Sequence, residues 1–418
     1  MSAGIKTGHG DNAMTRFIPA VCNPKTPQMY RQEERMKFFH LSDLHIGLKM
    51  MNRDLLEDQR YIFQQVTALA EREQPDAIVI AGDIYDKAVP SAEAVGLFDE
   101  LIVGLRMAVP KAAIMLISGN HDSAPRVNCF RSVLCAQNLY MIGMPPQTEA
   151  DQIAQVTLED TCGPVHFYLL PFVRPSMVKP ILGTDENGVN FSYDETVRRL
   201  LARESINTTE RNVLVTHQFY LPAGKLAEEI ERMDSETRTV GNIDQIRTDM
   251  LEPFDYVAMG HIHKPMQVGA KQYVYCGTPL ACSVSEAGQE KGIRMVELKE
   301  KGAEPKITVL PLVPLRQVRV VKGSLTEVLQ QACEDYATII LTDRVDLDVI
   351  DLQERLHAAF PYLLEIRREG LRTVSYERQQ TEEAVRNPYE LCSGFFQELD
   401  EEEKRLLRDV LQTVQEVK

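Results

Sequence analysis

Short apolar runs alternate with amphipathic segments over the first two thirds of the chain. One run begins at Ala77 and ends at Gly82 and Asp83, which is typical of a strand buried on both faces that stops where a carboxylate must leave the core. The segment 54–73 instead carries apolar residues at helical spacing. The pattern predicts strands at 37–41, 77–81, 112–117, 165–170, 212–216 and 256–259, and helices at 54–73, 91–107 and 193–205. This alternation indicates an α/β core.

The apolar pattern changes twice further along the chain. Three predicted strands, at 273–276, 292–298 and 307–310, lack polar residues at their ends, and we expect them to form a second sheet. From residue 315 a half-exposed strand is followed by Ser324 and Glu327, which have the spacing of a helix capping box. Strands at 337–341 and 363–368 and a helix at 347–360 complete this region. The sequence therefore predicts a small, separate α+β domain.

Two short amphipathic helices are predicted after Pro388. The first has Leu391, Phe395 and Leu399 at helical spacing, and Asp400 with Glu403 is placed to cap the second. The apolar stripe of the second helix consists of Leu407, Val410, Leu411, Val414 and Val417. These stripes either bind a partner surface or pack on their own domain, and the sequence leaves both alternatives open.

Length and composition add limits to this picture. A chain of 418 residues is expected to form two or three domains. It contains no apolar run long enough to span a membrane. Residues 1–35 lack the apolar segment of a secretory signal, so we expect a disordered leader, either an upstream-start extension or a cloning remnant, on a cytoplasmic protein. The eight cysteines contain no C-x-x-C pair, and they predict neither a disulfide framework nor a cysteine zinc site.

The net charge of −15 argues against a simple nucleic-acid coat. The excess is uneven, because residues 381–418 hold ten acidic and five basic side chains. Bound divalent cations would also reverse the local sign of the potential. The net charge therefore does not exclude a phosphate substrate.

Polar side chains with metal-binding groups follow five of the predicted strands. Taken singly, each has a simpler explanation, since a lone histidine beside a strand is usually packed or solvated. Ligands of open α/β sheets bind beyond the carboxyl ends of strands, and we expect these side chains to share one such edge. Five coincidences of strand end and ligand type are difficult to assign to turns alone. The residues are Asp43, His45, Asp83, Asn120, His121, His217, His261 and His263.

Such a set suits a pair of divalent ions. Two ions roughly 3.5–4 Å apart need a carboxylate to bridge them and further ligands on each. Mixed Asp, His and Asn ligands favour manganese, iron or zinc over magnesium or calcium. The paired ions would bind a phosphate, and His121 would then be able to donate a proton to a leaving oxygen or steady the phosphate.

The series Asp43-x-His45, Gly82-Asp83, Gly119-Asn120-His121-Asp122, His217 and Gly260-His261-x-His263 resembles the calcineurin-like metallophosphoesterases. The segments 41–47, 119–123 and 277–292 are similar to the nuclease branch of that superfamily. The resemblance implies a β-sandwich flanked by helices. It also implies that Asp83 bridges two divalent ions, expected to be Mn²⁺, with His121 as the catalytic histidine. Asp43, His45 and His263 would complete one ion site, and Asn120, His217 and His261 the other.

One position departs from the pattern of archaeal and eukaryotic relatives. They have a second functional histidine three residues after the bridging aspartate, where this chain has Asp86. Four other histidines receive no ligand role. His40 and His166 lie within predicted strands, His357 in a later helix and His9 in the leader.

The resemblance also implies a domain plan: a nuclease domain at 36–314, a capping domain at 315–383, and a segment at 384–418 that docks on an SMC-family coiled-coil ATPase. It further implies a DNA substrate and a homodimer, for which 91–107 and 126–135 are candidate contacts. We therefore expect a double-strand exonuclease and single-strand or hairpin endonuclease for DNA repair, recombination and replication. The alternatives are a phosphoesterase for small phosphate esters or cyclic nucleotides, and a metal-free scaffold, which the complete ligand set disfavours.

Overall fold

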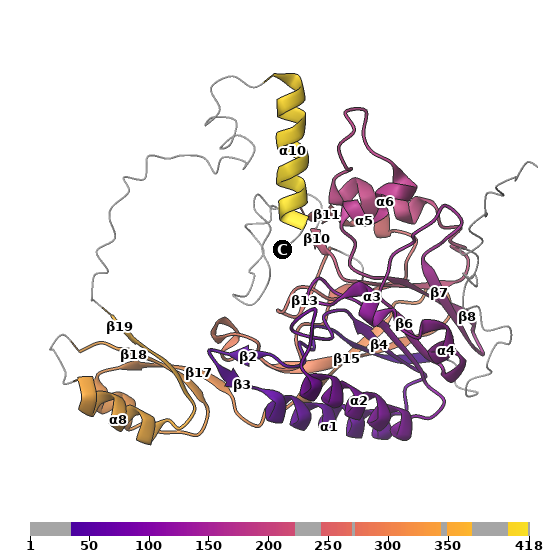
Figure 1. Ribbon diagram of the computed structural model, residues 1–418. Coiled ribbons are helices and arrows are strands. Elements are labelled where there is room, and N and C mark those ends of the chain that lie inside the picture. The colour runs from indigo at the N-terminus through magenta and orange to yellow at the C-terminus, as the bar shows by residue number, and fades with distance from the viewer. Residues whose placement is uncertain (1–34, 222–243, 270–271, 344–348, 370–399, 417–418) are drawn as a thin grey trace, which may run out of the picture.

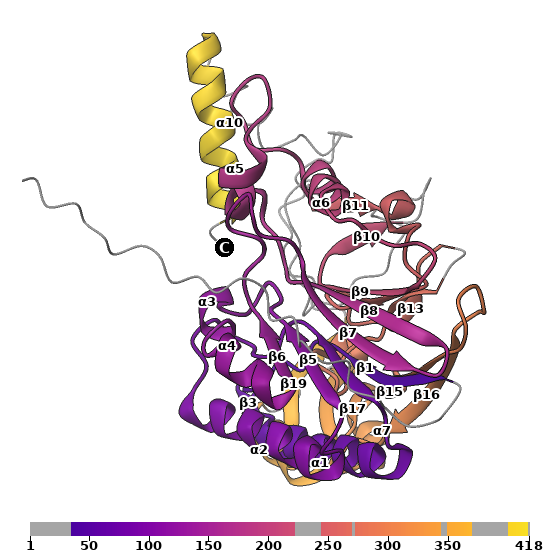
Figure 2. The same ribbon diagram turned by 90° about the vertical axis from the view of Figure 1, so that its right-hand side faces the viewer.

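The computed structural model describes residues 35–221, 244–269, 272–343, 349–369 and 400–416 (Figure 1). The predicted leader, and the first of the two predicted C-terminal helices, lie outside the described residues. Two six-stranded sheets stack face to face, and helices cover their outer faces (Figures 1 and 2). The predicted β-sandwich flanked by helices is therefore confirmed.

The first sheet has the order β16-β15-β1-β4-β5-β6. Its strands β1, β4, β5 and β6 run parallel, and β15 and β16 are added antiparallel beside β1. Helices α1 (Leu56–Glu73) and α2 (Ala92–Ala108) pack on the outer face. The strands are β1 (Met36–Leu41), β4 (Ala77–Ala81), β5 (Ala113–Ile117), β6 (Leu139–Ile142), β15 (Lys291–Leu298) and β16 (Lys306–Leu312).

The second sheet has the order β13-β14-β12-β9-β8-β7. Helix α6 (Tyr193–Ala202) packs on its outer face through Val197 and Leu200, and α5 (Pro175–Leu182) lies beside it. The strands are β7 (Ala154–Asp160), β8 (Gly163–Leu170), β9 (Arg211–Thr216), β12 (Tyr256–Met259), β13 (Met266–Gln267) and β14 (Tyr273–Tyr275). This domain also contains the short helices α3 (Ala124–Val127) and α4 (Arg131–Leu134). It is completed by two strand pairs, β2 (Lys49–Met50) with β3 (Arg53–Asp54) and β10 (Phe219–Leu221) with β11 (Gln245–Arg247).

The expectation that the three later strands form a sheet of their own is wrong. Strand β14 pairs in parallel with β12 in the second sheet. Strand β15 pairs antiparallel with β1 in the first sheet, from Met36 opposite Leu298 to His40 opposite Arg294. Apolar patterning predicts that a strand exists but not which neighbour it pairs with, and it also missed β6 and β7.

Alternating side chains of β1 serve the two layers of the core. Phe39 and Leu41 face α1 and α2, whereas Phe38 lies between the sheets. There the ring of Phe38 makes edge contacts with Phe167 and Tyr256 at centroid distances of 5.3 and 5.6 Å. The hydroxyl of Tyr256 on the second sheet also hydrogen-bonds to Nδ1 of His40 on the first, over 2.9 Å. His40 therefore has the structural role that was expected of it.

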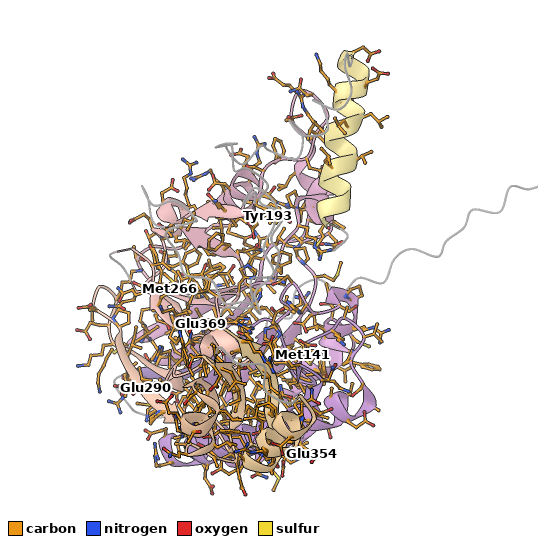
Figure 3. The ribbon with its side chains drawn as sticks, turned by 90° about the vertical axis from the view of Figure 1, so that its left-hand side faces the viewer. Met141, Tyr193, Met266, Glu290, Glu354 and Glu369 are labelled. Carbon is orange, nitrogen blue, oxygen red and sulfur yellow. The ribbon has the colours of Figure 1, made fainter. Side chains whose placement is uncertain are left out.

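A smaller unit follows the sandwich. Its strands β17 (Val318–Gly323), β18 (Tyr336–Leu341) and β19 (Leu363–Arg368) form a parallel sheet with α7 (Leu325–Leu329) and α8 (Val349–Ala359) between them. It has a hydrophobic cluster of its own, and the predicted capping box of Ser324 and Glu327 is present. Figure 3 shows Glu354 of α8 near the bottom of the view and Tyr193 of α6 well above it, on the other side of the sandwich.

Buried polar contacts fasten this unit to helix α1. Asp58, fully buried, accepts hydrogen bonds from Arg316 Nη1 at 2.9 Å and from the Tyr336 hydroxyl at 2.8 Å. The guanidinium of Arg316 also lies 4.2 Å from the ring centre of Tyr362. These contacts orient the smaller unit on the sandwich, although its limits at 315 and 383 remain a prediction.

Helix α10 (Glu401–Glu416) is the second predicted C-terminal helix. Asp400 and Glu403 cap it reciprocally, since each backbone N–H donates to the other side chain at 3.0 and 2.8 Å. Among the helices that the structure describes, none is both long and apolar enough to cross a membrane. Five described cysteines, Cys129, Cys162, Cys276, Cys282 and Cys333, are free thiols.

Candidate metal centre

The predicted ligands lie immediately after strands of both sheets. Asp43 and His45 follow β1, Asp83 follows β4, and Asn120 and His121 follow β5, all in the first sheet. His217 follows β9, and His261 and His263 follow β12, in the second. The expectation of one shared sheet edge is therefore wrong: the eight side chains meet where two sheets pack together.

One half of the cluster joins His45 and His263. Their Nε2 atoms are 3.1 Å apart, and His45 Nε2 is 3.8 Å from Asp83 Oδ2. Asp43, His45 and Asp83 each offer a ligand atom, and these atoms lie within 4.8 Å of one another. Two imidazoles and two carboxylates are thus brought together around this half.

The other half is centred on the side-chain oxygen of Asn120. It lies 3.0 Å from His217 Nε2 and 2.9 Å from His261 Nδ1. His217 Nε2 is also 3.2 Å from Asp83 Oδ2. Asp83 is therefore the side chain that borders both halves.

Backbone contacts hold these loops in place. The N–H groups of Asp43 and His45 donate to the carbonyls of Gly82 and Asp83, both at 3.0 Å. Asp122 accepts N–H groups of Ile84, Tyr85 and Gly119 at 2.9–3.0 Å, so its carboxylate joins the loops after β4 and β5. Burial and the nearby Asp83 raise the pKa of Asp122 to about 6.

The charged groups influence one another strongly because they are buried. Burial raises the pKa of Asp83, but His217 and His121 outweigh it and leave this pKa well below its usual range. Burial lowers the pKa of His217, but Asp83 and Asp43 outweigh it and raise the pKa to about 9. For His45 burial prevails, and its pKa lies well below the usual value. A cation bound through His217 would take the place of the proton that these carboxylates favour.

Two backbone carbonyls orient the imidazoles of His217 and His121. Nδ1–H of His217 donates to Ala81 O at 2.7 Å, and Nδ1–H of His121 donates to Asp86 O at 2.9 Å. A carbonyl only accepts, so each Nδ1 carries a proton and each Nε2 becomes the exchangeable position. Such hydrogen bonds orient metal-binding histidines in many proteins.

Three buried residues support His263 and were not proposed as site residues. Nδ1 of His263 lies 3.5 Å from Glu286 Oε1. Lys291 Nζ and the Thr278 hydroxyl donate to Glu286 Oε2 at 2.6 and 2.8 Å. Burial raises the pKa of Glu286, but His263 and Lys291 outweigh it and hold the pKa far below its usual range. The sequence did point to this region, because segment 277–292 is similar to the nuclease branch, but it predicted no role for any residue within the segment.

The donor set fits divalent cations. Two nitrogen ligands with bonds of 2.0–2.1 Å to one tetrahedral ion are separated by about 3.3 Å. The 3.1 Å between the Nε2 atoms of His45 and His263 is close to that spacing. Buried carboxylates and imidazoles, together with the half-buried amide of Asn120, could hold an ion on either side of Asp83.

Comparison with known proteins agrees with this chemistry. A family model for calcineurin-like phosphoesterases matches residues 36–265. A second model, described as a type 5 capsule protein repressor C-terminal domain, matches residues 313–399. A weak likeness to GAP50, the anchor in the inner membrane complex of Plasmodium, has a TM-score of 0.39 and 10% identity over 79% of this chain and 96% of that one. It carries no argument about function.

Two curated bacterial proteins, both named as the SbcD component of the nuclease SbcCD, are much more similar. The one from Staphylococcus epidermidis is 32% identical over 298 residues, which cover 71% of this chain and 75% of that protein. The one from Staphylococcus saprophyticus is 31% identical over 303 residues, covering 72% and 75%. The chain therefore belongs to the calcineurin-like phosphoesterases and, within them, to the family of SbcD proteins.

Proposed function

We propose that this chain is the metal-dependent nuclease component of an SbcCD-type complex and hydrolyses DNA phosphodiester bonds. The carrying observation is that ligand groups from five strand ends, on two sheets, surround the buried carboxylate of Asp83. Membership of the SbcD family favours DNA over small phosphate esters as the substrate. We infer activity as a double-strand exonuclease and as a single-strand or hairpin endonuclease in the cytoplasm.

The proposed centre holds two divalent ions, with Mn²⁺ as the preferred metal. Asp43, His45, Asp83 and His263 would hold one ion, and Asp83, Asn120, His217 and His261 the other. Bound ions of this kind polarise the phosphate, offset the charge that develops in the transition state and make water a stronger nucleophile. Asp83 is assigned to both ions because its Oδ2 lies near His45 and His217 alike.

His121 is the proposed catalytic histidine. Its backbone N–H donates to Asp83 Oδ1 at 2.8 Å, which fixes it beside the ligands. Its Nδ1–H is held by the carbonyl of Asp86, so Nε2 is the atom that would give a proton to the leaving oxygen. The imidazole is partly exposed, whereas His45 and His217 are buried, and a residue that meets substrate must be reachable.

The proposed partners are DNA, an SbcC-like SMC-family coiled-coil ATPase and a second copy of the chain. On helix α10, Leu406 and Val410 are spaced one turn apart and are 64% and 49% exposed, which supports a docking role for this helix. Met107 of α2 and Phe130 beside α4 are also exposed apolar side chains, and they support the dimer contact that was predicted there. The smaller unit beside the sandwich is the proposed cap that helps to select DNA ends.

The proposed activity is tested with the full chain and Mn²⁺ on blunt, recessed and hairpin duplexes. We expect cleavage of all three and faster cleavage in the presence of a co-purified coiled-coil ATPase. Turnover of a chromogenic phosphodiester without any cleavage of DNA would instead favour a phosphoesterase for small substrates.

The docking role of α10 is tested by Leu406→Glu with Val410→Glu. We expect this pair of changes to abolish co-purification of the ATPase and to preserve Mn²⁺ binding. Changing Lys404→Glu and Arg408→Glu on the same helix, at a half-buried and an exposed position, controls for the added negative charge. Retained co-purification after the first pair of changes would contradict the docking role.

A further inference from the structure

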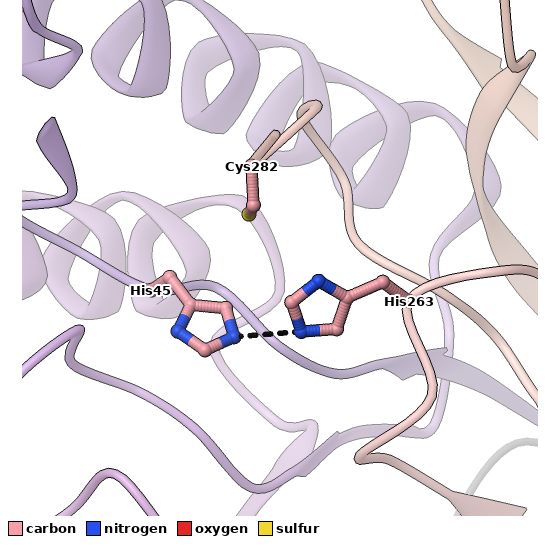
Figure 4. A group of neighbouring side chains, drawn as sticks. All are labelled: His45, His263 and Cys282. Carbon is pink, nitrogen blue, oxygen red and sulfur yellow. Dashed lines mark hydrogen bonds between the residues drawn. The ribbon is translucent and has the colours of Figure 1, made fainter. Parts of the chain in front are cut away.

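A buried thiol lies beside the His45–His263 half of the centre. Cys282 comes from the loop before the short helix η5 (Val284–Glu286). One ligand atom each of His45, His263 and Cys282 lies within 4.8 Å of the others. Figure 4 shows the sulfur of Cys282 directed toward the two facing imidazoles. The proposed nuclease chemistry uses the two imidazoles of this cluster but gives no role to the thiol.

The position of the sulfur is fixed by the same carboxylate that supports His263. The backbone N–H of Cys282 donates to Glu286 Oε1 at 3.1 Å, and that oxygen faces His263 Nδ1 at 3.5 Å. Glu286 is itself anchored by Lys291. The cysteine and the histidine are therefore set in place together, and the thiol does not reach the imidazoles by chance rotation of an exposed side chain.

The ligand types of this cluster favour a different class of ion from the rest of the centre. Asp43 and Asp83 provide oxygen ligands, which suit harder ions such as Mn²⁺, whereas two imidazoles and a thiolate suit Zn²⁺ or Cd²⁺. In a tetrahedral zinc site a sulfur and a nitrogen ligand are about 3.6 Å apart. The separation between the sulfur of Cys282 and each imidazole nitrogen therefore needs to close by about 1.2 Å at most, because it is already within 4.8 Å.

We propose that His45, His263 and Cys282 together bind a thiophilic ion, such as Zn²⁺ or Cd²⁺, at this half of the centre. When such an ion binds, the thiol proton leaves to solvent and a sulfur–metal bond forms, without any change of oxidation state. An ion held in this way occupies the two imidazoles that the nuclease needs for its own ion. The ion-binding claim stands on the cluster alone, and its consequence, inhibition by zinc or cadmium, rests on the proposed nuclease function.

The binding claim is tested on metal-free full-length protein titrated with Cd²⁺. The parent protein is expected to show a thiolate-to-metal absorption band in the ultraviolet that saturates at one ion per chain. Cys282→Ser and His263→Ala should each remove it, while Cys129→Ser, at an exposed cysteine, should keep it. A band that survives Cys282→Ser or His263→Ala, or that is absent from the parent protein, overturns the proposal. Circular dichroism of each variant shows whether it is folded.

The consequence is tested by Zn²⁺ inhibition of Mn²⁺-dependent DNA cleavage, with each rate normalised to that variant's own rate without zinc. Cys282→Ser is expected to raise the zinc concentration for half-inhibition by at least about tenfold, in line with the loss of a metal-site interaction. Equal inhibition of parent and variant would overturn the inhibitory role. Absence of Mn²⁺-dependent cleavage in the parent would instead overturn the proposed function, and the cadmium band would still decide the binding claim.

Discussion

The two sheets of the sandwich contribute different chemistry to the candidate centre. The first sheet provides the carboxylates Asp43 and Asp83, the amide of Asn120 and the imidazole of His45. The second sheet provides imidazoles alone, from His217, His261 and His263. Neither sheet carries both ligand sets, so the centre is created by the packing of one sheet against the other.

Contacts across this junction are short. His217 Nδ1 lies 2.7 Å from Ala81 O, and the N–H of His261 donates to Asp43 Oδ1 at 3.0 Å. A Cβ atom added at Gly260 would lie only 2.0 Å from Ala81 O. A glycine is therefore required where the loop after β12 meets strand β4, and the candidate ligands of the two sheets are held at close range as a result.

Removing the charge that both halves share is expected to have the largest effect. Asp83→Asn keeps the shape of the side chain but removes the buried negative charge between His45 and His217. We expect loss of both ions, measured as metal content per chain, and a fall in DNA cleavage of more than about 10⁴-fold. Retention of two ions and of cleavage would end the two-metal interpretation. His45→Ala, at a residue assigned to one ion only, is the matched comparison.

The next effect concerns a residue of the first sheet that is not assigned as a ligand. His121→Ala should lower kcat by about 10²–10⁴-fold, the usual contribution of an acid or base catalyst. The metal content should not change, because the side chain of His121 is not assigned to either ion. Unchanged cleavage with full metal content would remove His121 from the catalytic role.

A smaller effect is expected from the residue that supports the second sheet's His263. Glu286→Gln keeps hydrogen bonding but weakens the hold on the imidazole, so Mn²⁺ affinity should fall by about 10–100-fold. The affinity is measured by calorimetry on the metal-free protein. Glu290→Gln, at an exposed carboxylate four residues away, should leave the affinity unchanged. A similar affinity for both variants would show that Glu286 does not support the site.

The smallest effect concerns the hydrogen bond between the sheets at His40 and Tyr256. Burial and the nearby Arg294 lower the pKa of His40 from 6.5 to about 3. The unfolded chain therefore binds a proton that the folded protein does not, and stability is lost as the pH falls below 6.5. At pH 5 this linkage amounts to roughly 2 kcal/mol.

His40→Gln, which can still accept the Tyr256 hydroxyl, should remove this pH dependence. The free energy of unfolding of each protein is measured in urea at pH 7 and at pH 5. Between these two pH values the parent should lose about 2 kcal/mol more stability than the variant. His357→Gln, on the exposed side of α8, serves as the control. An equal pH dependence in parent and His40→Gln would contradict the assignment.

The sequence predicted individual elements well because each depends on local patterns. Ser91 caps α2, Ser324 and Glu327 form the expected box, and the strands that end in ligands lie within about a residue of their predicted limits. The eight candidate side chains were found because each stands next to an apolar run, at a place where a strand must end. Their roles as ligands remain a proposal.

The arrangement of the sheets was not predictable in the same way. Whether β14 pairs with β12 or with β15 depends on contacts between residues far apart in the chain, and no local pattern records it. Glu286 was missed for a similar reason. An acidic residue in a short polar segment looks solvent-exposed in sequence, and only the folded chain places Glu286 against His263 and Lys291.

The backbone at the centre carries a conformational cost. Asp43, His45, Asp83 and His261 all have positive φ, at 53°, 42°, 47° and 99°, a region that glycine tolerates best. Each such residue costs about 1–3 kcal/mol of folding free energy. A search for thermostabilising substitutions would consequently select glycine at these positions and discard the proposed ligands, so heat resistance would be gained at the expense of the proposed activity.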